Sequence, residues 1–361
     1  MTIVHGVLSL EVGGLERIVV ALARGQAEQD HAVTVLCLET QGTLARELEA
    51  AGVTVIALNK PPGRPVEFAN TVNTALKSLS PQVLHTHQIG VAFHLAAIAK
   101  SLGVRVIHTE HGNPFVRAAG LVAAAKMRLL MRTAVRNIDR FCCVSDEIAA
   151  TVRRWQTVSA AKVQVVPNGI APPPNVPNDF RSKLGIPADA NVVGTVGRLH
   201  EVKQQQVLLQ AVAKLPGVWA LLVGDGPERD SLTKLAADLG IMSRTVFAGY
   251  QTEPWGALQA MDVFALTSRS EGFPVSLLEA WALSKPAVCS AVGGLTTIIE
   301  NNVNGVLISA GDINGFASAF ESLLNDHDHA DEIAAGGLST FEKQYTLNAM
   351  LNRYQFLYSS M

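Results

Sequence analysis

The sequence has little cysteine and lacks long apolar runs, and both shortages limit its class. The four cysteines are Cys37, Cys142, Cys143 and Cys289, and none belongs to a C-x-x-C pair. We therefore expect neither a disulfide framework nor a zinc site, but buried thiols in a reducing cytosol. No window holds about 18 or more uninterrupted apolar residues, so we expect no membrane-spanning helix.

An excess of charge and a secretion signal are also missing. Lys plus Arg number 29 and Asp plus Glu 31, giving a formal net charge of -2. This balance argues against a general nucleic-acid-binding protein, although it allows a local basic patch. The first residues, MTIVHGVLSLEVGG, have no basic region and no long apolar core. They predict a first β-strand and a cytoplasmic protein, not a signal peptide.

The chain does contain enough apolar residues for two cores. It has 361 residues, of which 48% are hydrophobic, so two domains are expected. Short β-branched runs alternate with helical patterns, which indicates parallel sheets covered by helices on both faces. The expected strands are TIVHGVLSL, AVTVLCLE, VTVIAL, QVLHTH, RVIHTEH, RFCCVS and VQVVPN, followed by NVVGTVG, WALLVG, TVFAG, VFALTS, PAVCSA and GVLIS.

A proline-rich stretch separates the two halves. Residues 167–180, PNGIAPPPNVPNDF, contain five prolines, a density typical of an interdomain connection. We predict an α/β protein with two Rossmann-like, doubly wound domains, residues 1–170 and 171–344. Ligands of such sheets bind beyond the carboxyl ends of the strands, so functional residues are expected on the loops that follow strands, around a cleft between the domains.

The segment EGFPVSLLEA, residues 271–280, places two carboxylates around a predicted helix start. Pro274 suits a first helical turn, Gly272 allows close approach of the backbone, and a helix N-terminus attracts phosphate. Glu271 and Glu279 can accept hydrogen bonds from hydroxyls at the two ends of a ligand that has phosphates between them. The alternative is an ordinary helix start with an acidic first residue.

Two more loops that follow strands carry groups suited to phosphate. Arg198 and Lys203, in VGRLHEVK, can grip a diphosphate through charge-assisted hydrogen bonds, or they can be two exposed cations on a solvated loop. Gly13 and Gly14 can present backbone N–H groups to the same phosphates, although a Gly-Gly pair at such a turn is common. VGDGPER, residues 223–229, is an incomplete dinucleotide fingerprint and counts against an NAD-dependent oxidoreductase.

Together these motifs resemble glycosyltransferase family 4, a family of retaining enzymes with the GT-B fold. The resemblance covers nearly the whole chain and includes the E-x7-E motif EGFPVSLLEA. Its other motifs are GGLER, HTEHG, CVSDEI, VVPNGI, VGRLHEVK, LLVGDGPER, VFAGY and AVGGLTTIIENNVNGVL. It implies a nucleotide-sugar donor on the second domain, an acceptor on the first, no metal requirement, and a C-terminal helix, 345–361, that packs back on the first domain.

The resemblance also implies roles for particular residues. Glu271 would hold hydroxyls of the donor sugar, Glu279 the ribose, and Arg198 with Lys203 the diphosphate, while His111 would lie beside the transferred sugar. The expected catalytic residues are Arg198, Lys203, Glu271 and His111. The expected donor-binding residues are Gly13, Gly14, Gly272, Phe273, Pro274, Val275 and Glu279. Two positions depart from the family pattern: Gln204 stands where glycine or asparagine is frequent, and Ser284 stands where glycine is common. Both put loop geometry in doubt.

Histidines form two weaker patterns. His85 and His87 end a predicted strand in LHTHQ, with His94 and His108 nearby. A metal site is conceivable, but strand-end histidines that line a polar cleft are the favoured interpretation, with His87 near the acceptor. NDHDHADE, residues 325–332, is favoured as a solvated turn and helix start over a metal site.

The segment 116–140 carries basic residues at a spacing of four. Arg128, Arg132, Arg136 and Arg140 would form one stripe on a helix, with leucine, methionine and alanine opposite. Such a helix can lie on an anionic membrane surface or meet a lipid-linked acceptor, and the alternative is the solvated face of a core helix.

These patterns lead to one expected function. We expect a metal-independent, retaining glycosyltransferase in the cytoplasm or at the inner face of the membrane, in cell-surface polysaccharide or lipopolysaccharide assembly. Its partners would be a nucleotide-sugar, with UDP favoured over GDP-mannose, and a glycan or lipid-linked acceptor, with no nucleic acid. The alternatives are a sugar-nucleotide epimerase and a catalytically silent subunit.

Overall fold

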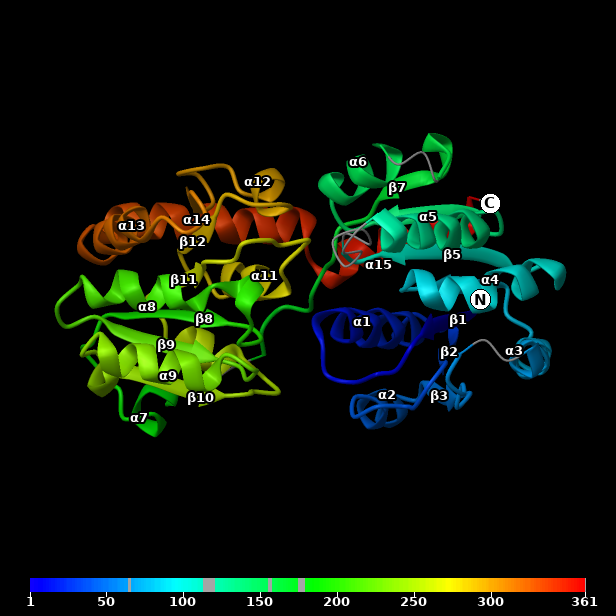
Figure 1. Ribbon diagram of the computed structural model, residues 1–361, viewed down its shortest axis with the longest axis horizontal. Coiled ribbons are helices and arrows are strands. Elements are labelled where there is room, and N and C mark those ends of the chain that lie inside the picture. Colours follow the sequence, from blue (N-terminus) through cyan, green and yellow to red (C-terminus); the bar gives the residue numbers. More distant parts are fainter. Residues whose placement is uncertain (64–65, 113–120, 155–157, 175–178, 361) are drawn as a thin grey trace. The chain divides into compact units, whose positions relative to one another are not determined.

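The computed structural model divides into two compact units, each described here by itself (Figure 1). It describes residues 1–361 except 64–65, 113–120, 155–157, 175–178 and 361. The first unit comprises Met1–Ala171 and Leu347–Met361, and the second comprises Pro172–Thr346.

The first unit is built on a seven-stranded parallel sheet in the order β3-β2-β1-β4-β5-β6-β7. The strand order reverses between β1 and β4, which makes this pair the topological switch point. The strands are β1 (Thr2–Val7), β2 (Ala32–Cys37), β3 (Thr54–Ala57), β4 (Val83–Thr86), β5 (Arg105–Glu110), β6 (Arg140–Cys143) and β7 (Val163–Val165).

Helices connect these strands and cover the sheet. They are α1 (Gly14–Glu28), α2 (Ala45–Ala50), α3 (Val66–Leu79), α4 (Ile89–Ser101), α5 (Leu121–Val135) and α6 (Asp146–Arg154), with a 3-10 turn at Ala160–Lys162. The last helix of the chain, α15 (Leu347–Ser359), packs against α1, and Gly25 of α1 lies directly under Leu351. A side chain at position 25 would clash with that leucine, so the glycine permits the close approach of the two helices.

The second unit repeats the architecture with six parallel strands in the order β10-β9-β8-β11-β12-β13. Its switch point lies between β8 and β11. The strands are β8 (Val192–Val196), β9 (Trp219–Val223), β10 (Thr245–Gly249), β11 (Val263–Leu266), β12 (Ala287–Ser290) and β13 (Val306–Ile308).

Helices lie in two groups around this sheet. Helix α8 (Gln205–Ala213) contacts α9 (Arg229–Asp238) and α13 (Ile313–Asn325), whereas α11 (Val275–Ala282) contacts α10 (Trp255–Gln259) and α14 (His327–Gln344). The remaining short helices are α7 (Phe180–Lys183) and α12 (Leu295–Ile298), with 3-10 turns at Glu201–Lys203 and Met242–Arg244.

The fold class expected from the alternating pattern is confirmed. Each of the thirteen expected segments contains a strand, seven in the first sheet and six in the second. The continuous apolar strand β11 is buried along its whole length, as a parallel strand between helical layers must be. The four cysteines are buried and free, and burial raises the pKa of the Cys37 thiol to about 12.

Candidate active site

The two loops at the switch point of the second unit are fastened to each other. One follows β8 and contains Arg198 and Lys203, and the other follows β11 and contains Glu271. The Thr267 hydroxyl donates to the carbonyls of Lys203 and Gln204 at 3.2 and 2.9 Å. The backbone N–H of Arg269 donates to the Val202 carbonyl at 2.8 Å. These bonds place residues separated by almost seventy positions side by side.

Lys203 and Glu271 form an ion pair in which Nζ lies 2.7 Å from Oε1. The Ser268 hydroxyl donates to the same oxygen at 2.5 Å. The Glu271 side chain is 7% exposed and that of Lys203 is 26% exposed, so the pair is largely shielded from water. Among the described residues, Glu271 Oε2 has no hydrogen-bond partner, and the ammonium of Lys203 keeps two further N–H donors. The pair can therefore bind hydroxyls and an anion at once.

Arg198 lies on the same loop as Lys203 and is exposed. Its carbonyl accepts a hydrogen bond from the Gln205 amide at 3.0 Å, which anchors the backbone, while its guanidinium has no partner among the residues that the structure describes. The loop thus holds two cations, one fixed by a carboxylate and one free to move to an anionic ligand.

The helix that carries Glu279 begins at Val275, with Pro274 at the N-cap position in an extended conformation. Glu279 is buried at 8% exposure, on the second turn of α11. Phe273 and Pro274 are buried, whereas Gly272 and Val275 are half-buried, and the Phe273 ring packs edge-on against Tyr345 with centroids 5.5 Å apart. Aromatic packing therefore fixes the strand-to-helix turn between the two carboxylates.

The two departures from the family pattern occur where the backbone is left-handed. Gln204 has φ of 48° and Ser284 has φ of 52°. Glycine adopts this region without strain, and other residues do so at a cost of about 1–2 kcal/mol. A left-handed backbone at both positions explains why glycine, or asparagine at the first of them, is expected there from the family resemblance.

Gly224 and Gly226 pack against the backbone of the loop that follows β8. A Cβ at Gly224 would lie 2.0 Å from the Gly197 carbonyl oxygen, and one at Gly226 would lie 2.2 Å from that of Leu199. The backbone N–H of Leu199 donates to the Asp225 carbonyl at 2.9 Å. The incomplete fingerprint is therefore explained by close packing of two backbones beside Arg198.

Gly13 and Gly14 lie at the start of α1 in the first unit, Gly13 as the N-cap residue. A Cβ at Gly14 would meet no atom within 4 Å, so its backbone is open to close approach. The carboxylate of Glu16 lies over Gly13, and burial raises its pKa. This acidic group already occupies part of the helix N-terminus that the sequence predicts for phosphate.

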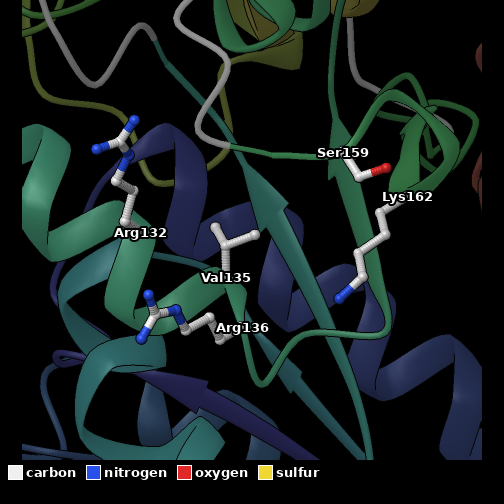
Figure 2. A pocket seen from close by; sticks show the side chains of 5 residues that line it. All are labelled: Arg132, Val135, Arg136, Ser159 and Lys162. Atoms are coloured by element: carbon white, nitrogen blue, oxygen red, sulfur yellow. The ribbon is translucent and has the colours of Figure 1, made fainter.

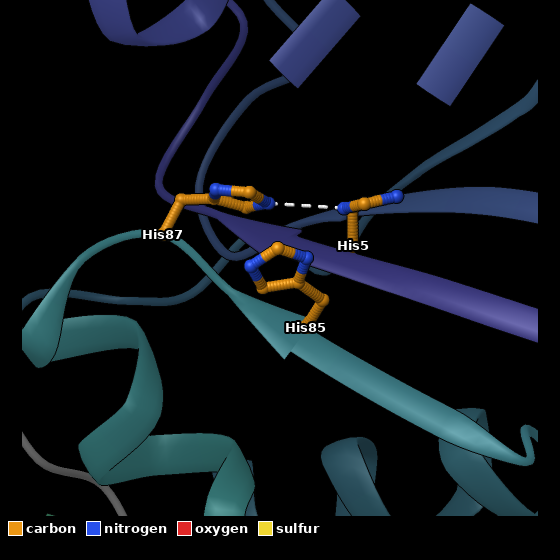
Figure 3. Close-up of side chains that lie close together, drawn as sticks. All are labelled: His5, His85 and His87. Atoms are coloured by element: carbon orange, nitrogen blue, oxygen red, sulfur yellow. Dashed lines mark hydrogen bonds between the residues drawn. The ribbon is translucent and has the colours of Figure 1, made fainter. Parts of the chain in front are cut away.

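Histidines gather at the switch point of the first unit, where His5 of β1 joins His85 and His87 of the β4 end (Figure 3). All three are buried, which corrects the expectation that strand-end histidines line a polar cleft. Their closest ligand atoms lie within 4.8 Å of one another, as a metal site would require. No pattern in the sequence pointed to His5, because its neighbour in the sheet, His85, is 80 residues away.

The ring nitrogens of these histidines are engaged in hydrogen bonds. His5 bonds to His87 and Gln26 at 2.9 and 2.7 Å, His85 to Tyr358 and Thr109 at 2.8 and 2.7 Å. The remaining nitrogen of His87 lies 3.1 Å from Nε2 of His111. All six ring nitrogens of His5, His85 and His87 are engaged, so a metal would have to break several of these bonds. The cluster fits a hydrogen-bonded network better.

The second histidine pattern is a helix start, as predicted. Asp326 caps α14, where its carboxylate accepts a hydrogen bond from the backbone N–H of His329 at 3.1 Å. This is the ordinary role of an aspartate at an N-cap position.

The predicted basic stripe is wrong in its length. Helix α5 ends at Val135, so Arg136 lies in the turn that follows and Arg140 begins β6. Arg117, a further basic residue of the 116–140 segment, lies outside the described residues. The leucines do not all face the core either, since Leu129 is 68% exposed on the same surface as Arg132. Arg128 is half-buried, while Arg132 and Arg136 are exposed.

A basic hollow of about 300 Å³ lies next to the end of α5 (Figure 2). It is lined by Arg132, Val135, Arg136, Ser159 and Lys162. The ammonium of Lys162 donates to the Ile138 carbonyl at 2.6 Å, so its position is fixed. Three cations from two segments of the chain thus surround one apolar residue. None of the described helices is long and apolar enough to cross a membrane.

Both halves of the chain match known glycosyltransferase families. Residues 12–172 match the family described as Glycosyltransferase Family 4, and residues 177–338 match Glycosyl transferases group 1. The lipopolysaccharide core biosynthesis glycosyltransferase LpsD of Rhizobium meliloti is 31% identical over 291 residues, 80% of this chain and 78% of its own length.

Two further relatives match over shorter stretches. LpsE of the same organism, also a lipopolysaccharide core biosynthesis glycosyltransferase, is 37% identical over 227 residues, 62% of this chain. D-inositol 3-phosphate glycosyltransferase of Mycolicibacterium paratuberculosis is 32% identical over 272 residues, 70% of this chain. The matches span 65% and 62% of the lengths of these two relatives, less than two thirds of each.

Solved structures share the fold. Anabaena Alr3699/HepE in complex with UDP and glucose has a TM-score of 0.87 at 22% identity, with 100% of both chains covered. WaaG, a glycosyltransferase involved in lipopolysaccharide biosynthesis, has a TM-score of 0.78 at 17% identity, with 99% of this chain covered. The two doubly wound units are thus those of the GT-B fold, and this chain belongs to glycosyltransferase family 4.

Proposed function

We propose that the protein is a retaining glycosyltransferase that moves a sugar from a nucleotide-diphosphate sugar to a glycan or lipid-linked acceptor. The observation that carries this proposal is the Lys203–Glu271 pair at the switch point of the second sheet, in a chain of this family. The free oxygen of Glu271 accepts hydroxyls of the donor sugar, while Lys203 and Arg198 hold the diphosphate. Glu279, deeper in α11, accepts the ribose hydroxyls.

The chemistry requires separation of charge. Breaking the bond between the anomeric carbon and the diphosphate leaves positive charge on the sugar ring and negative charge on the leaving group. Lys203 and Arg198 stabilise the leaving group, and a preorganised cation is effective because it need not reorient during the reaction. The ion pair and the Thr267 hydrogen bonds to the loop supply that preorganisation for Lys203.

Glu271 does not act as the nucleophile in this proposal. One of its oxygens is engaged by an ammonium and by the Ser268 hydroxyl, which lowers the reactivity of the carboxylate. We therefore propose that the acceptor attacks the face from which the phosphate departs. The departing phosphate oxygen takes the acceptor proton, and the configuration of the anomeric carbon is retained.

UDP-sugars are the favoured donors. HepE, which shares the fold, binds UDP and UDP-glucose, and LpsE and LpsD act in lipopolysaccharide core biosynthesis. These similarities favour a UDP-sugar donor and a role in cell-surface polysaccharide or lipopolysaccharide assembly. GDP-mannose is the second candidate donor.

Thermal unfolding with UDP, GDP, ADP or CMP tests the donor. A nucleotide present at a hundred times its dissociation constant should stabilise the folded protein by about 2.7 kcal/mol. We expect UDP alone to raise the melting temperature, and Lys203→Met to weaken that shift while the matched exposed variant Lys214→Met does not. A shift with GDP alone would replace UDP in the proposal, and no shift with any nucleotide would favour a silent subunit.

We also propose that the exposed surface around α5 contacts anionic lipid. Lys126, Leu129, Arg132 and Arg136 are exposed there, and the basic hollow lies beside them. An apolar side chain among cations suits a membrane interface, where the leucine enters the lipid and the cations meet headgroups.

Vesicle co-sedimentation tests this contact. The wild-type protein should sediment with vesicles of phosphatidylglycerol and phosphatidylcholine, and less with phosphatidylcholine alone. Arg132→Glu with Arg136→Glu should reduce binding to anionic vesicles about tenfold or more, since each surface cation contributes about 1 kcal/mol. Lys214→Glu with Lys234→Glu changes the charge equally at exposed positions of the second unit and should leave binding unchanged. Equal losses in both pairs would contradict the proposal.

A further inference from the structure

A chain of buried hydrogen bonds in the first unit ends at His111. It begins at Gln26 of α1, whose Oε1 lies 2.7 Å from Nε2 of His5. Nδ1 of His5 lies 2.9 Å from Nε2 of His87 (Figure 3). Nδ1 of His87 lies 3.1 Å from Nε2 of His111. His111 Nδ1, at the far end, is buried and has no hydrogen-bond partner among the described residues.

The side chain of Gln26, at the start of this hydrogen-bond chain, is fixed by α15, the last helix of the protein. The Gln26 amide nitrogen donates to the Tyr358 hydroxyl at 3.1 Å, which turns its oxygen towards His5. Tyr358 is in turn held by Nδ1 of His85 at 2.8 Å, and Arg105 donates to its backbone carbonyl at 2.6 Å. Gln26 and Tyr358 are both buried, so water does not compete for these bonds.

Each histidine ring in this hydrogen-bond chain is neutral. Donor and acceptor nitrogens can therefore alternate along the hydrogen-bond chain in one direction. Burial lowers the pKa of His5 to about 4 and that of His111 to about 3, and it lowers the pKa of His87 well below its usual range. A neutral imidazole has one donor and one acceptor nitrogen. Because an amide oxygen only accepts, His5 Nε2 must donate, His5 Nδ1 must accept, and the same alternation passes to His87 and His111.

We propose that Gln26, His5 and His87 are positioning residues that hold His111 as the Nε2–H tautomer, with Nδ1 left as a bare acceptor. This inference rests on the proposed function for its purpose: His111 Nδ1 accepts a hydrogen bond from a hydroxyl of the substrate. The reverse direction would place an N–H at Nδ1 without an acceptor, and orphaned buried N–H groups are rarer than orphaned acceptors.

The fixed tautomer presents one defined acceptor to a substrate hydroxyl. A protonated His111 would carry a positive charge and would offer an N–H donor at Nδ1 instead. The hydrogen-bond chain therefore keeps His111 neutral and leaves its Nδ1 as an acceptor that carries no negative charge. His85, although its ring centroid is 4.2 Å from that of His87, bonds to Tyr358 and Thr109 and is not a link in this chain.

The first test is the tautomer of His111 in the full-length protein without any nucleotide. Long-range ¹H–¹⁵N correlation spectra of protein labelled at histidine distinguish a protonated from a bare ring nitrogen, and His111→Gln assigns the signals. We expect a protonated Nε2 and a bare Nδ1. A protonated Nδ1 would overturn the proposal, whatever the donor of the enzyme is.

The same substitution at two buried histidines then separates a role in positioning His111 from a role in packing. His5→Phe breaks the hydrogen-bond chain, and His108→Phe is the matched control, since both residues are fully buried on strands of the same sheet and His108 bonds to Thr86, outside the hydrogen-bond chain. We expect His5→Phe to leave His111 in a mixture of tautomers and to lower kcat about tenfold, the effect of one hydrogen bond, with KM unchanged. His108→Phe should keep the single tautomer of His111.

The outcomes are distinct. A single Nε2–H tautomer in His5→Phe, or the same change in both variants, would overturn the positioning role. If His5→Phe does not fold, Gln26→Met removes the acceptor at nearly constant volume and should give the same mixture of tautomers. Failure of every nucleotide to bind would remove the proposed function without altering the tautomer result.

Discussion

Replacing Lys203 by methionine should slow hydrolysis of the nucleotide-sugar donor about a hundredfold or more. Removing one preorganised contact to developing charge costs about 3 kcal/mol in the transition state. Methionine keeps most of the side-chain volume and removes only the charge, so packing changes little. Hydrolysis of the donor by water is the measurement, because it requires no acceptor. Lys214→Met, at an exposed position in the same unit, should hydrolyse the donor at the wild-type rate.

The ion pair predicts a second consequence of this substitution. Without Lys203, the carboxylate of Glu271 stays buried with only the Ser268 hydroxyl as a partner. Lys203→Met should therefore lower the free energy of unfolding by about 2 kcal/mol, and adding Glu271→Gln should restore part of it. Additive losses in the double variant would show that the two residues do not interact, and an unchanged hydrolysis rate would remove Lys203 from the catalytic residues.

Acidification from pH 6.5 to about 4.5 should destabilise the first unit by several kcal/mol. Burial lowers the pKa of His5 in the folded protein from 6.5 to about 4, so the unfolded chain binds more protons between these values. Stability is therefore complete above pH 6.5 and is lost as the pH falls towards 4, by about 3 kcal/mol for His5 alone. The pKa values of His85, His87 and His111 are lowered too, and these groups add to the loss.

Hydrogen exchange read by mass spectrometry measures this loss in each unit separately. Peptides from β1 and β4 should lose protection at a higher pH than peptides from β8 and β11. His85→Gln removes one buried imidazole and should make the dependence of stability on pH shallower, by up to about 1.4 kcal/mol per pH unit. His327→Gln, an exposed control in the second unit, should leave the dependence unchanged. The same slope in wild type and His85→Gln would contradict the prediction.

Periodicity predicted the strands well because both sheets are parallel and buried. Such strands are short, continuous apolar runs that are separated by helical patterns, and each of the expected segments contains a strand. The end of α5 was predicted poorly. A spacing of four between arginines indicates a helical stripe only while the helix continues, and nothing in MRTAVRNIDR states that the turn begins after Val135.

The residues of the candidate site were found from motifs, but their contacts were not. The motifs identify Lys203 and Glu271, whereas the ion pair between them depends on the order of β8 and β11 in the sheet. Gln204 and Ser284 depart from the residues that the family resemblance leads us to expect, and this marked both positions as unusual. Only the backbone shows the cause, which is a positive φ at each.

The sequence by itself determined the two doubly wound units, the family, and the loops that carry Arg198, Lys203, Glu271 and Glu279, because period, turn residues and motifs are local properties of the chain. Only the tertiary structure decided which distant side chains meet. His5, Gln26 and Tyr358 join His87 and His111 because β1 lies beside β4 and α15 packs on α1. Strand order and helix docking bring together residues more than 300 positions apart, and no local pattern encodes such contacts.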